Sequence, residues 1–363
     1  MNWIKKNFNS LLVVILSSLL GVVLLEISLR IANFDDPWIK TREANILRDI
    51  EFTIDISNVY QHDSTSADYV RNKYGLRDTC DSTSDIDILT IGGSTTDQRW
   101  VPSSFTYQSI LEERLTAQKI DFGCVSNAGV DGHSTWGHIF SFENWFPLIP
   151  ELKPKFIVLY VGINDANFQR TNSPSSGFDN NNRAGIKELL RRLEIVRGLL
   201  PIYRLLRQSY ENASAAYAGH TATLYDFSDY NVNVMNEKTP LLAKQNAEAF
   251  ESRMLILLEK IMALNAIPIC VTQPHRFILE KNGQFYGLPN ILGEGFSGLD
   301  FDYSISQLNE VMFKLCGENT LDLYNYTFSD SHFYDGVHTT AQGSKVIGER
   351  LADFILTRFF LDK

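Results

Sequence analysis

Apolar and amphipathic segments alternate along the chain from Asp85 onward. The runs IDILTIG, FGCVSNAG, KFIVLYVG and IPICVTQP are short and largely apolar, which predicts buried β-strands. The stretches SFTYQSILEERLTAQ, KQNAEAFESRMLILLEKIMALN and TTAQGSKVIGERLADFILTRFF carry apolar residues at helical spacing, and TLDLY adds a short fifth strand. Apolar strands that alternate with helices predict an α/β fold, with a parallel sheet of about five strands covered by helices on both faces.

The first 32 residues follow a different pattern. Residues 7–25 carry no charge, are apolar on every helix face, and come directly after Lys5 and Lys6. About 20 apolar residues cross a bilayer as a helix, and no small-residue cleavage site follows. Lysines before the apolar run favour a cytoplasmic amino terminus. We expect residues 1–32 to be an uncleaved, single-pass transmembrane signal anchor, which places the rest of the chain on the periplasmic or extracellular side; a buried amphipathic helix is the alternative.

Two further regions stand apart from the strand–helix alternation. Residues 33–84 are polar and mixed, and we expect a stalk that leads into an α/β domain over residues 85–363. Within that domain, the segment over residues 171–244, approximately, contains a polar loop and an arginine-bearing helical pattern that is interrupted at Pro201. This pattern predicts a helical insertion, either packed on the domain or acting as a lid or membrane-surface patch.

Composition narrows the function classes. The net charge of −10 and the lack of a basic stripe with interleaved aromatic residues argue against nucleic-acid binding. The four cysteines form no C-x-x-C pair, so we expect no zinc or other metal site. Cys124 and Cys270 fall in predicted strands, where we expect small buried thiols. A disulfide that involves Cys80 or Cys316 is compatible with a location outside the cytoplasm.

Polar, glycine-rich segments follow the predicted strands. GGST comes after the first strand, NAGVDGHS after the second and GIND after the third, while DSHFYDGVH lies near the carboxyl end of the chain. In a parallel sheet, ligands bind beyond the carboxyl ends of the strands. We therefore expect the four segments to meet at one edge of the sheet.

These segments contain the groups that serine hydrolysis requires. Ser94 can serve as the nucleophile, and His338 as the base that takes its proton, with Asp335 three residues earlier to orient the imidazole. Gly132 offers a backbone N–H and Asn164 a side-chain N–H for the oxyanion.

The four blocks GGST, NAGVDG, GIND and DGVH, in this order, resemble the motifs of the SGNH (GDSL-type) hydrolase family over residues 85–363. The resemblance implies a three-layer α/β/α, flavodoxin-like fold with strand order 2-1-3-4-5. It also implies a site composed of the nucleophile Ser94, the base His338, its partner Asp335, and an oxyanion hole of Ser94, Gly132 and Asn164. One position departs from the family, because Gly93 stands where an aspartate usually precedes the serine; this weakens the match to the lipase-like branch.

Several residues have competing interpretations. GGSTTD lacks the lysine of a phosphate-binding loop. His332 lacks an acid three residues earlier, which favours His338 as the base. Asp165 is expected to brace its loop through hydrogen bonds. The remaining candidates for substrate contact, each with a structural role as the alternative, are His275, Arg276 and Trp136.

The sequence thus predicts a membrane-anchored extracytoplasmic serine esterase that needs no cofactor. It would hydrolyse acetyl or other short-chain esters through an acyl-enzyme, on a small molecule or polysaccharide. The alternatives are an O-acyltransferase, a lipid or thioester hydrolase, and an anchored scaffold without activity.

Overall fold

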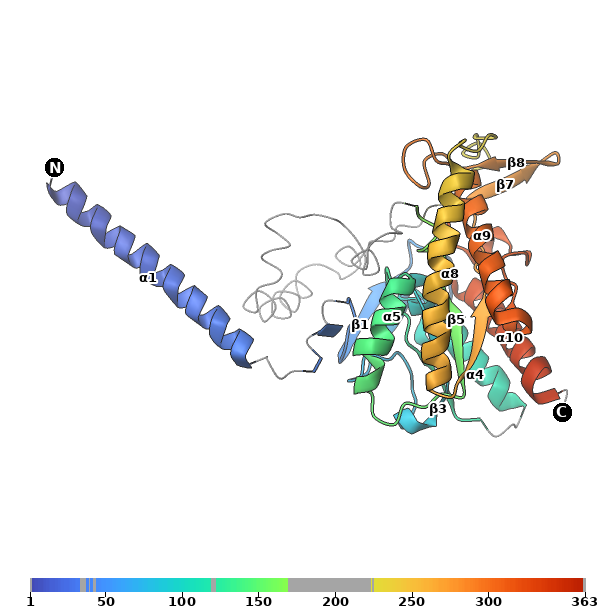
Figure 1. Ribbon diagram of the computed structural model, residues 1–363, viewed down its shortest axis with the longest axis horizontal. Helices are drawn as coiled ribbons and strands as arrows, with labels where there is room; N and C mark the ends of the chain where they lie inside the picture. The colour runs from blue at the N-terminus through green and yellow to red at the C-terminus, as the bar shows by residue number, and fades with distance from the viewer. Residues whose placement is uncertain are drawn as a thin grey trace. The chain divides into compact units, whose positions relative to one another are not determined.

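The computed structural model describes residues 2–32, 37–38, 40–41, 44–118, 122–168, 223 and 225–361 (Figure 1). The described residues divide between two compact units. Helix α1 (Asn2–Ala32) belongs to the first unit, and all described residues from Lys40 onward belong to the second. The second unit contains the strands and the candidate site.

Helix α1 exposes large apolar side chains, among them Val13, Leu19 and Ile31. Among the described residues, no helix combines the length and the apolar character that a membrane crossing requires. The transmembrane helix predicted over residues 1–32 is therefore not confirmed.

The second unit is organised around the predicted parallel sheet of five strands. The strands are β3 (Ile86–Gly92), β4 (Cys124–Asn127), β5 (Phe156–Tyr160), β6 (Ile267–Val271) and β9 (Thr320–Leu321). They lie in the order β4-β3-β5-β6-β9, and every neighbouring pair is parallel. Counted along the chain from β3, this order reads 2-1-3-4-5. Every residue of β3 and β5 is buried, which explains why these segments are nearly continuous apolar runs.

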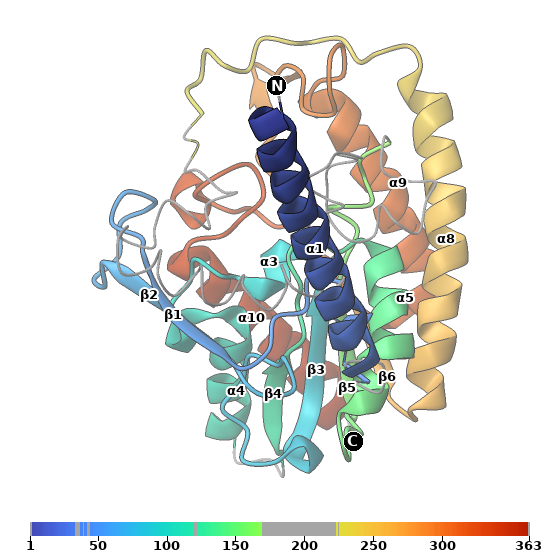
Figure 2. The same ribbon diagram turned by 90° about the vertical axis from the view of Figure 1, so that its left-hand side faces the viewer.

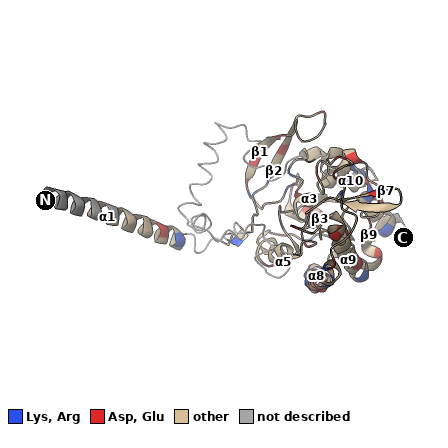
Figure 3. Ribbon diagram, turned by 90° about the horizontal axis from the view of Figure 1, so that it is seen from above, with Lys and Arg blue, Asp and Glu red and all other residues tan. Residues whose placement is uncertain are grey.

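Helices cover both faces of the sheet (Figures 1 and 2). One face packs against α4 (Tyr107–Ala117) and α10 (Ala341–Ile355), and the opposite face against α5 (Thr135–Asn144), α8 (Thr239–Ala263) and α9 (Gly298–Cys316). Shorter helical turns are η1 (Thr83–Asp85), α3 (Ser94–Asp97), η2 (Ser103–Phe105), η3 (Phe146–Leu148), η5 (Gly317–Asn319), η6 (Asp330–His332) and η7 (Leu356–Leu361). Acidic and basic residues are interspersed along α8, α9 and α10 (Figure 3).

An amino-terminal hairpin belongs to the second unit. Strands β1 (Ile50–Asp55) and β2 (Ser66–Arg71) pair antiparallel. Their inner face buries Ile54 and Ala67 against Trp100 and Tyr334. The described residues of the expected stalk from Lys40 onward thus belong to the second compact unit, and alternate side chains of the hairpin are apolar and pack on that unit. A second hairpin consists of β7 (Ile278–Lys281) and β8 (Gln284–Gly287).

Most of the helical insertion predicted over residues 171–244 lies outside the described residues. Its described end, from Tyr225, forms turns before α8 begins at Thr239. Its expected role as a packed insertion or lid stays a prediction.

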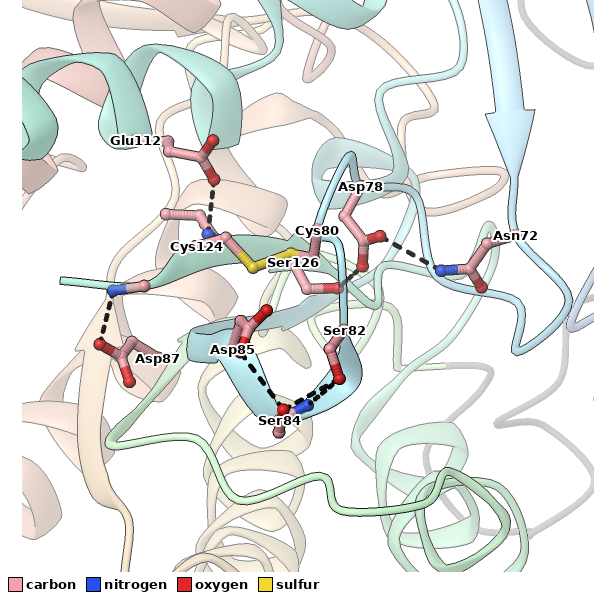
Figure 4. Close-up of a disulfide and its surroundings, with 12 residues drawn as sticks. Asn72, Asp78, Cys80, Ser82, Ser84, Asp85, Asp87, Glu112, Cys124 and Ser126 are labelled. Atoms are coloured by element: carbon pink, nitrogen blue, oxygen red, sulfur yellow. Dashed lines mark hydrogen bonds between the residues drawn. A yellow bond between two sulfur atoms is a disulfide. The ribbon is translucent and has the colours of Figure 1, made fainter.

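All four cysteines form disulfides, Cys80–Cys124 and Cys270–Cys316. Figure 4 shows the first bond at the start of β4, near Asp78 and Ser126. The expectation that Cys124 and Cys270 are free buried thiols is wrong. Cys124 lies in β4 and Cys270 in β6, and each pairs with a cysteine outside the sheet, Cys80 or Cys316. The spacing of cysteines along the sequence does not show which segments lie side by side in the fold.

Candidate active site

The nucleophile candidate Ser94 lies on a sharp turn at the carboxyl end of β3. The strand ends at Gly92, Gly93 precedes the single helical turn α3, and the turn closes when the Gln98 N–H donates to the Ser94 carbonyl at 2.9 Å. A Cβ atom at Gly92 would collide with the Tyr160 carbonyl, and one at Gly93 would lie 2.5 Å from Asn164 Nδ2. Both glycines therefore allow close approach of the turn to β5 and to the loop after it.

Ser94, His338 and Asp335 form a continuous hydrogen-bonded chain. His338 Nε2 lies 2.7 Å from Ser94 Oγ, and His338 Nδ1 lies 2.7 Å from Asp335 Oδ2. Asp335 Oδ1 also accepts the backbone N–H groups of Val337 and His338, at 2.8 and 2.7 Å. The segment is a bend between η6 and α10 rather than a turn of helix, and these two bonds fix its shape.

The electrostatics of Asp335 suit an orienting carboxylate. Burial alone would raise its pKa, but the charge of His338 and the hydrogen bonds from His338 and Val337 outweigh burial, so the pKa of Asp335 lies below its usual value. Asp335 therefore remains ionised near neutral pH and can stabilise an imidazolium at His338.

A column of aromatic rings fixes the plane of the His338 imidazole. Tyr334 stacks on His338 with ring centres 5.6 Å apart and planes 9° from parallel. Tyr60 stacks in turn on Tyr334 at 5.9 Å and 13°, and its hydroxyl donates to the Trp100 carbonyl at 2.8 Å. Because Tyr60 follows β1, the hairpin contributes directly to the geometry of the candidate base.

The oxyanion-donor candidates lie on the next two loops. Gly132 has a φ of +79°, a conformation that favours glycine. Asn164 Nδ2 donates to the His133 carbonyl at 2.9 Å, which orients the amide beside Gly93. A side-chain amide has two N–H groups, so this bond uses one of them.

Asp165 braces the same loop, as predicted. Its carboxylate accepts from Thr135 Oγ1 at 2.5 Å and from Arg253 Nη2 at 3.2 Å. Burial raises the pKa of Asp165 above its usual value, although Arg253 and Thr135 act in the opposite direction. Through these two contacts, Asp165 connects the loop after β5 to the first residue of α5 and to α8.

A buried ionic network beneath the nucleophile turn escaped the sequence interpretation. Asp97 Oδ1 accepts from Arg71 Nη2 at 2.6 Å and from the Tyr69 hydroxyl at 2.7 Å, while Oδ2 accepts from Arg99 Nη2 at 3.1 Å. Burial would raise the pKa of Asp97, but Arg71 and Arg99 hold it below the usual value. Tyr69 and Arg71 lie on β2; the apolar–polar alternation of residues 50–55 was the available signal for this hairpin.

The remaining candidates have partners of their own. His332 Nδ1 accepts the Ser329 N–H at 3.2 Å, whereas His338 bonds Ser94. The side chain of His275 is only 2% exposed, with Nε2 3.1 Å from Asp302 Oδ1. Arg276 donates to Asp330 at 2.8 Å. The Arg253 guanidinium lies 5.7 Å from the centre of the Trp136 ring. Substrate contact by His275, Arg276 or Trp136 stays a prediction.

A small pocket opens beside the hydrogen-bonded chain. Its lining residues are Ser94, His338, Tyr334, Asp97, Arg99, Trp100 and Asp131, and its volume is about 10 Å³.

In the described part of the chain, no group of three or more His, Cys, Asp or Glu side chains is arranged to hold a metal ion.

Comparisons with known proteins place this chain in a family. The family model described as GDSL-like Lipase/Acylhydrolase matches residues 88–351. No curated protein matches the chain.

Several solved structures are similar to this chain at low identity. A lipase/acylhydrolase from Enterococcus faecalis is 13% identical, covers 75% of this chain and 97% of its own, and has a TM-score of 0.42. The esterase EstA from Pseudoalteromonas sp. is 12% identical, covers 74% and 96%, and has a TM-score of 0.38. The acetyl xylan esterase AlAXEase is 14% identical, covers 74% and 98%, and has a TM-score of 0.38. On the family match, the chain belongs to the GDSL-like lipase/acylhydrolase family of ester-hydrolysing serine hydrolases.

Proposed function

We propose that the protein is a serine esterase in which Ser94 attacks an ester carbonyl while His338 accepts its proton. The observation that carries the proposal is the Ser94–His338–Asp335 chain, with its two hydrogen bonds of 2.7 Å. Asp335 holds the imidazole so that Nε2 faces the serine, and it stabilises the charge that forms when the proton arrives. In nucleophilic catalysis, a serine hydroxyl is generally activated by a base to which it is hydrogen-bonded.

The tetrahedral oxyanion would be held by the backbone N–H groups of Ser94 and Gly132 and by the amide of Asn164. The close approach of Asn164 to the nucleophile turn, where Gly93 has no side chain, supports this role. Donors that are already oriented need no rearrangement when the negative charge develops. Collapse of the intermediate expels the alcohol, which takes its proton from His338, and leaves the acyl group on Ser94.

The substrate in this proposal is an acetyl or other short-chain ester on a carbohydrate. The choice rests on location, since a protein held outside the cytoplasm meets envelope or exported polysaccharide. Two disulfides favour that location, because such bonds persist in oxidising compartments. Exposed apolar side chains along α1, such as Val13 and Leu19, support attachment to a membrane.

The proposal is tested on the full chain beside Ser94→Ala. Labelling by a fluorophosphonate and hydrolysis of p-nitrophenyl acetate, both lost in the variant, are the expected result. Faster turnover of long-chain than of short-chain esters would favour the lipid-hydrolase alternative. A folded protein that is neither labelled nor active would overturn the enzymatic assignment and favour the scaffold.

A further inference from the structure

The side chain of Gln273 connects two segments of the candidate site. Gln273 lies two residues after the end of β6 and is only 1% exposed. Its Oε1 accepts the backbone N–H of Ile163 at 2.7 Å, and its Nε2 donates to the hydroxyl of Thr95, also at 2.7 Å. Ile163 directly precedes Asn164, and Thr95 directly follows Ser94. One buried amide therefore joins the nucleophile turn to the loop that carries an oxyanion-donor candidate.

The order of the strands explains why a residue after β6 can make both contacts. Strand β5 lies between β3 and β6, so the Gln273 side chain crosses the end of β5 to meet the turn after β3. The backbone N–H of Ile163 can only donate, so the amide oxygen must face it, and the amide nitrogen then faces Thr95. Because both bonds belong to one amide group, the position of each segment depends on the other.

The backbone beside Gln273 is also held in place. Thr272 is buried, and its hydroxyl accepts the backbone N–H groups of Leu323 and Tyr324, each at 2.9 Å. The amide of Gln273 therefore extends from a point that is fixed to the loop after β9.

The two contacts are arranged to matter for catalysis as well as for stability. An oxyanion hole is effective because its donors are already oriented when the negative charge develops. A shift of about 1 Å in such a group can cost roughly 10²-fold in rate. The distance between Ser94 and the Asn164 amide is therefore a quantity that the proposed reaction requires to be fixed.

We infer that Gln273 is a positioning residue that sets the separation between Ser94 and the amide of Asn164. The inference rests on the proposed function, since it requires Ser94 as the nucleophile and Asn164 as an oxyanion donor. Gln273 acts through Ile163 and Thr95 rather than on the substrate. Its contribution is therefore greatest in the transition state, when the oxyanion forms.

The first test uses Gln273→Met in the full chain, which keeps the length of the side chain and removes both hydrogen bonds. We expect kcat and kcat/KM for p-nitrophenyl acetate to fall together by about 10²-fold, with KM unchanged. Fluorophosphonate labelling of Ser94 should slow as well. In a protein that already carries Asn164→Ala, the same change should cost little more, because the donor that Gln273 positions is absent.

The second test acts at the other end of the contact and does not depend on whether Gln273→Met folds. Thr95→Val keeps the shape of the side chain and removes the hydroxyl, and should lower kcat roughly tenfold. Thr95→Ser keeps the hydroxyl and should retain most of the activity. Thr90→Val is the matched control, since Thr90 is buried in β3 and its hydroxyl bonds Ser126 and Gln108. Its turnover should be unchanged.

Three outcomes would overturn the inference. The first is wild-type turnover in folded Gln273→Met, and the second is equal activity of Thr95→Val and Thr95→Ser. The third is a set of losses that multiply when Gln273→Met and Asn164→Ala are combined, since Gln273 would then support the fold and not the Asn164 amide. Failure of the wild-type protein to be labelled would instead refute the proposed esterase function.

Discussion

Asp97 Oδ1 lies 2.6 Å from Nη2 of Arg71, and each side chain is only 1% exposed. This buried ion pair joins the nucleophile turn, which carries Asp97, to strand β2 of the amino-terminal hairpin. Removal of one partner from a buried pair leaves an uncompensated charge, which is much more costly than loss of a surface pair.

We therefore expect Asp97→Asn to lower the free energy of unfolding by about 3–5 kcal/mol. The same change at Asp353, which pairs with Arg114 at 3.5 Å on the surface, should cost less than about 1 kcal/mol. Urea denaturation of both variants measures the difference. Equal effects would show that the hairpin does not depend on the buried pair.

Ser94→Ala should reduce turnover by roughly 10⁶-fold, the scale seen when the serine of another triad enzyme is removed. His338→Ala should have a similar effect, and the double variant should be little worse than either, because the two side chains act as one unit. His332→Ala serves as the control. The assignment is tested by measuring hydrolysis of p-nitrophenyl acetate by these four variants. If the losses of turnover in the two single variants multiplied in the double variant, the assignment would be contradicted.

Gly93→Ala should impair the proposed oxyanion hole without unfolding the protein. Its new Cβ would lie 2.5 Å from Asn164 Nδ2 and 3.1 Å from the His133 carbonyl, so the amide must move away. We expect a loss of about 10²–10³ in kcat, as for removal of one oxyanion donor, and little further loss when Asn164→Ala is added. Gly21→Ala is the control, since no described atom lies within 4 Å of its added Cβ.

Acid should destabilise the protein through His133. Burial lowers the pKa of His133 from 6.5 to about 4, although the Ala44 carbonyl acts in the opposite direction. Between these two values the unfolded state binds the proton and the folded state does not, so stability falls as the pH decreases from 6.5 to about 4. The loss for this group is at most about 3 kcal/mol.

Urea denaturation at several pH values across this window measures the effect. His133→Gln should lose stability less steeply with acid than the wild-type protein, while buried His138, whose pKa is also lowered by burial, retains its own contribution. Identical slopes for the two proteins would contradict the prediction.

Loss of the Cys80–Cys124 bond should lower the free energy of unfolding by about 2–4 kcal/mol, since the bond closes a loop of sequence separation 44. The double variant Cys80→Ser/Cys124→Ser, compared with wild type under non-reducing conditions, provides the measurement. The bond at Cys270–Cys316 spans a similar separation of 46 and is the internal comparison. A double variant as stable as wild type would show that the strand pairing alone holds β4.

The sequence predicted the candidate site best where polar, potentially reactive residues directly follow a predicted strand. The apolar runs predicted the five strands, and the polar residues after them predicted the segments that bring Ser94, Asn164 and His338 to one edge of the sheet. The hairpin escaped prediction because its outer residues are polar and its partners, Trp100 and Tyr334, are distant in sequence. A disulfide at Cys80 or Cys316 was left open by the sequence, but the partners Cys124 and Cys270 were not predicted, because crossover connections set which strand lies beside each cysteine.

The hydrogen bond between Ser94 and His338 joins residues 244 positions apart. Chains are synthesised from the amino terminus, and contacts between distant residues require closure of a long loop before they form. The residues of the nucleophile turn and of the hairpin are therefore made long before the base, and the hairpin also waits for Tyr334, on which it packs. The nascent chain remains without a paired serine until the segment before α10 docks, so esterase activity marks the end of folding.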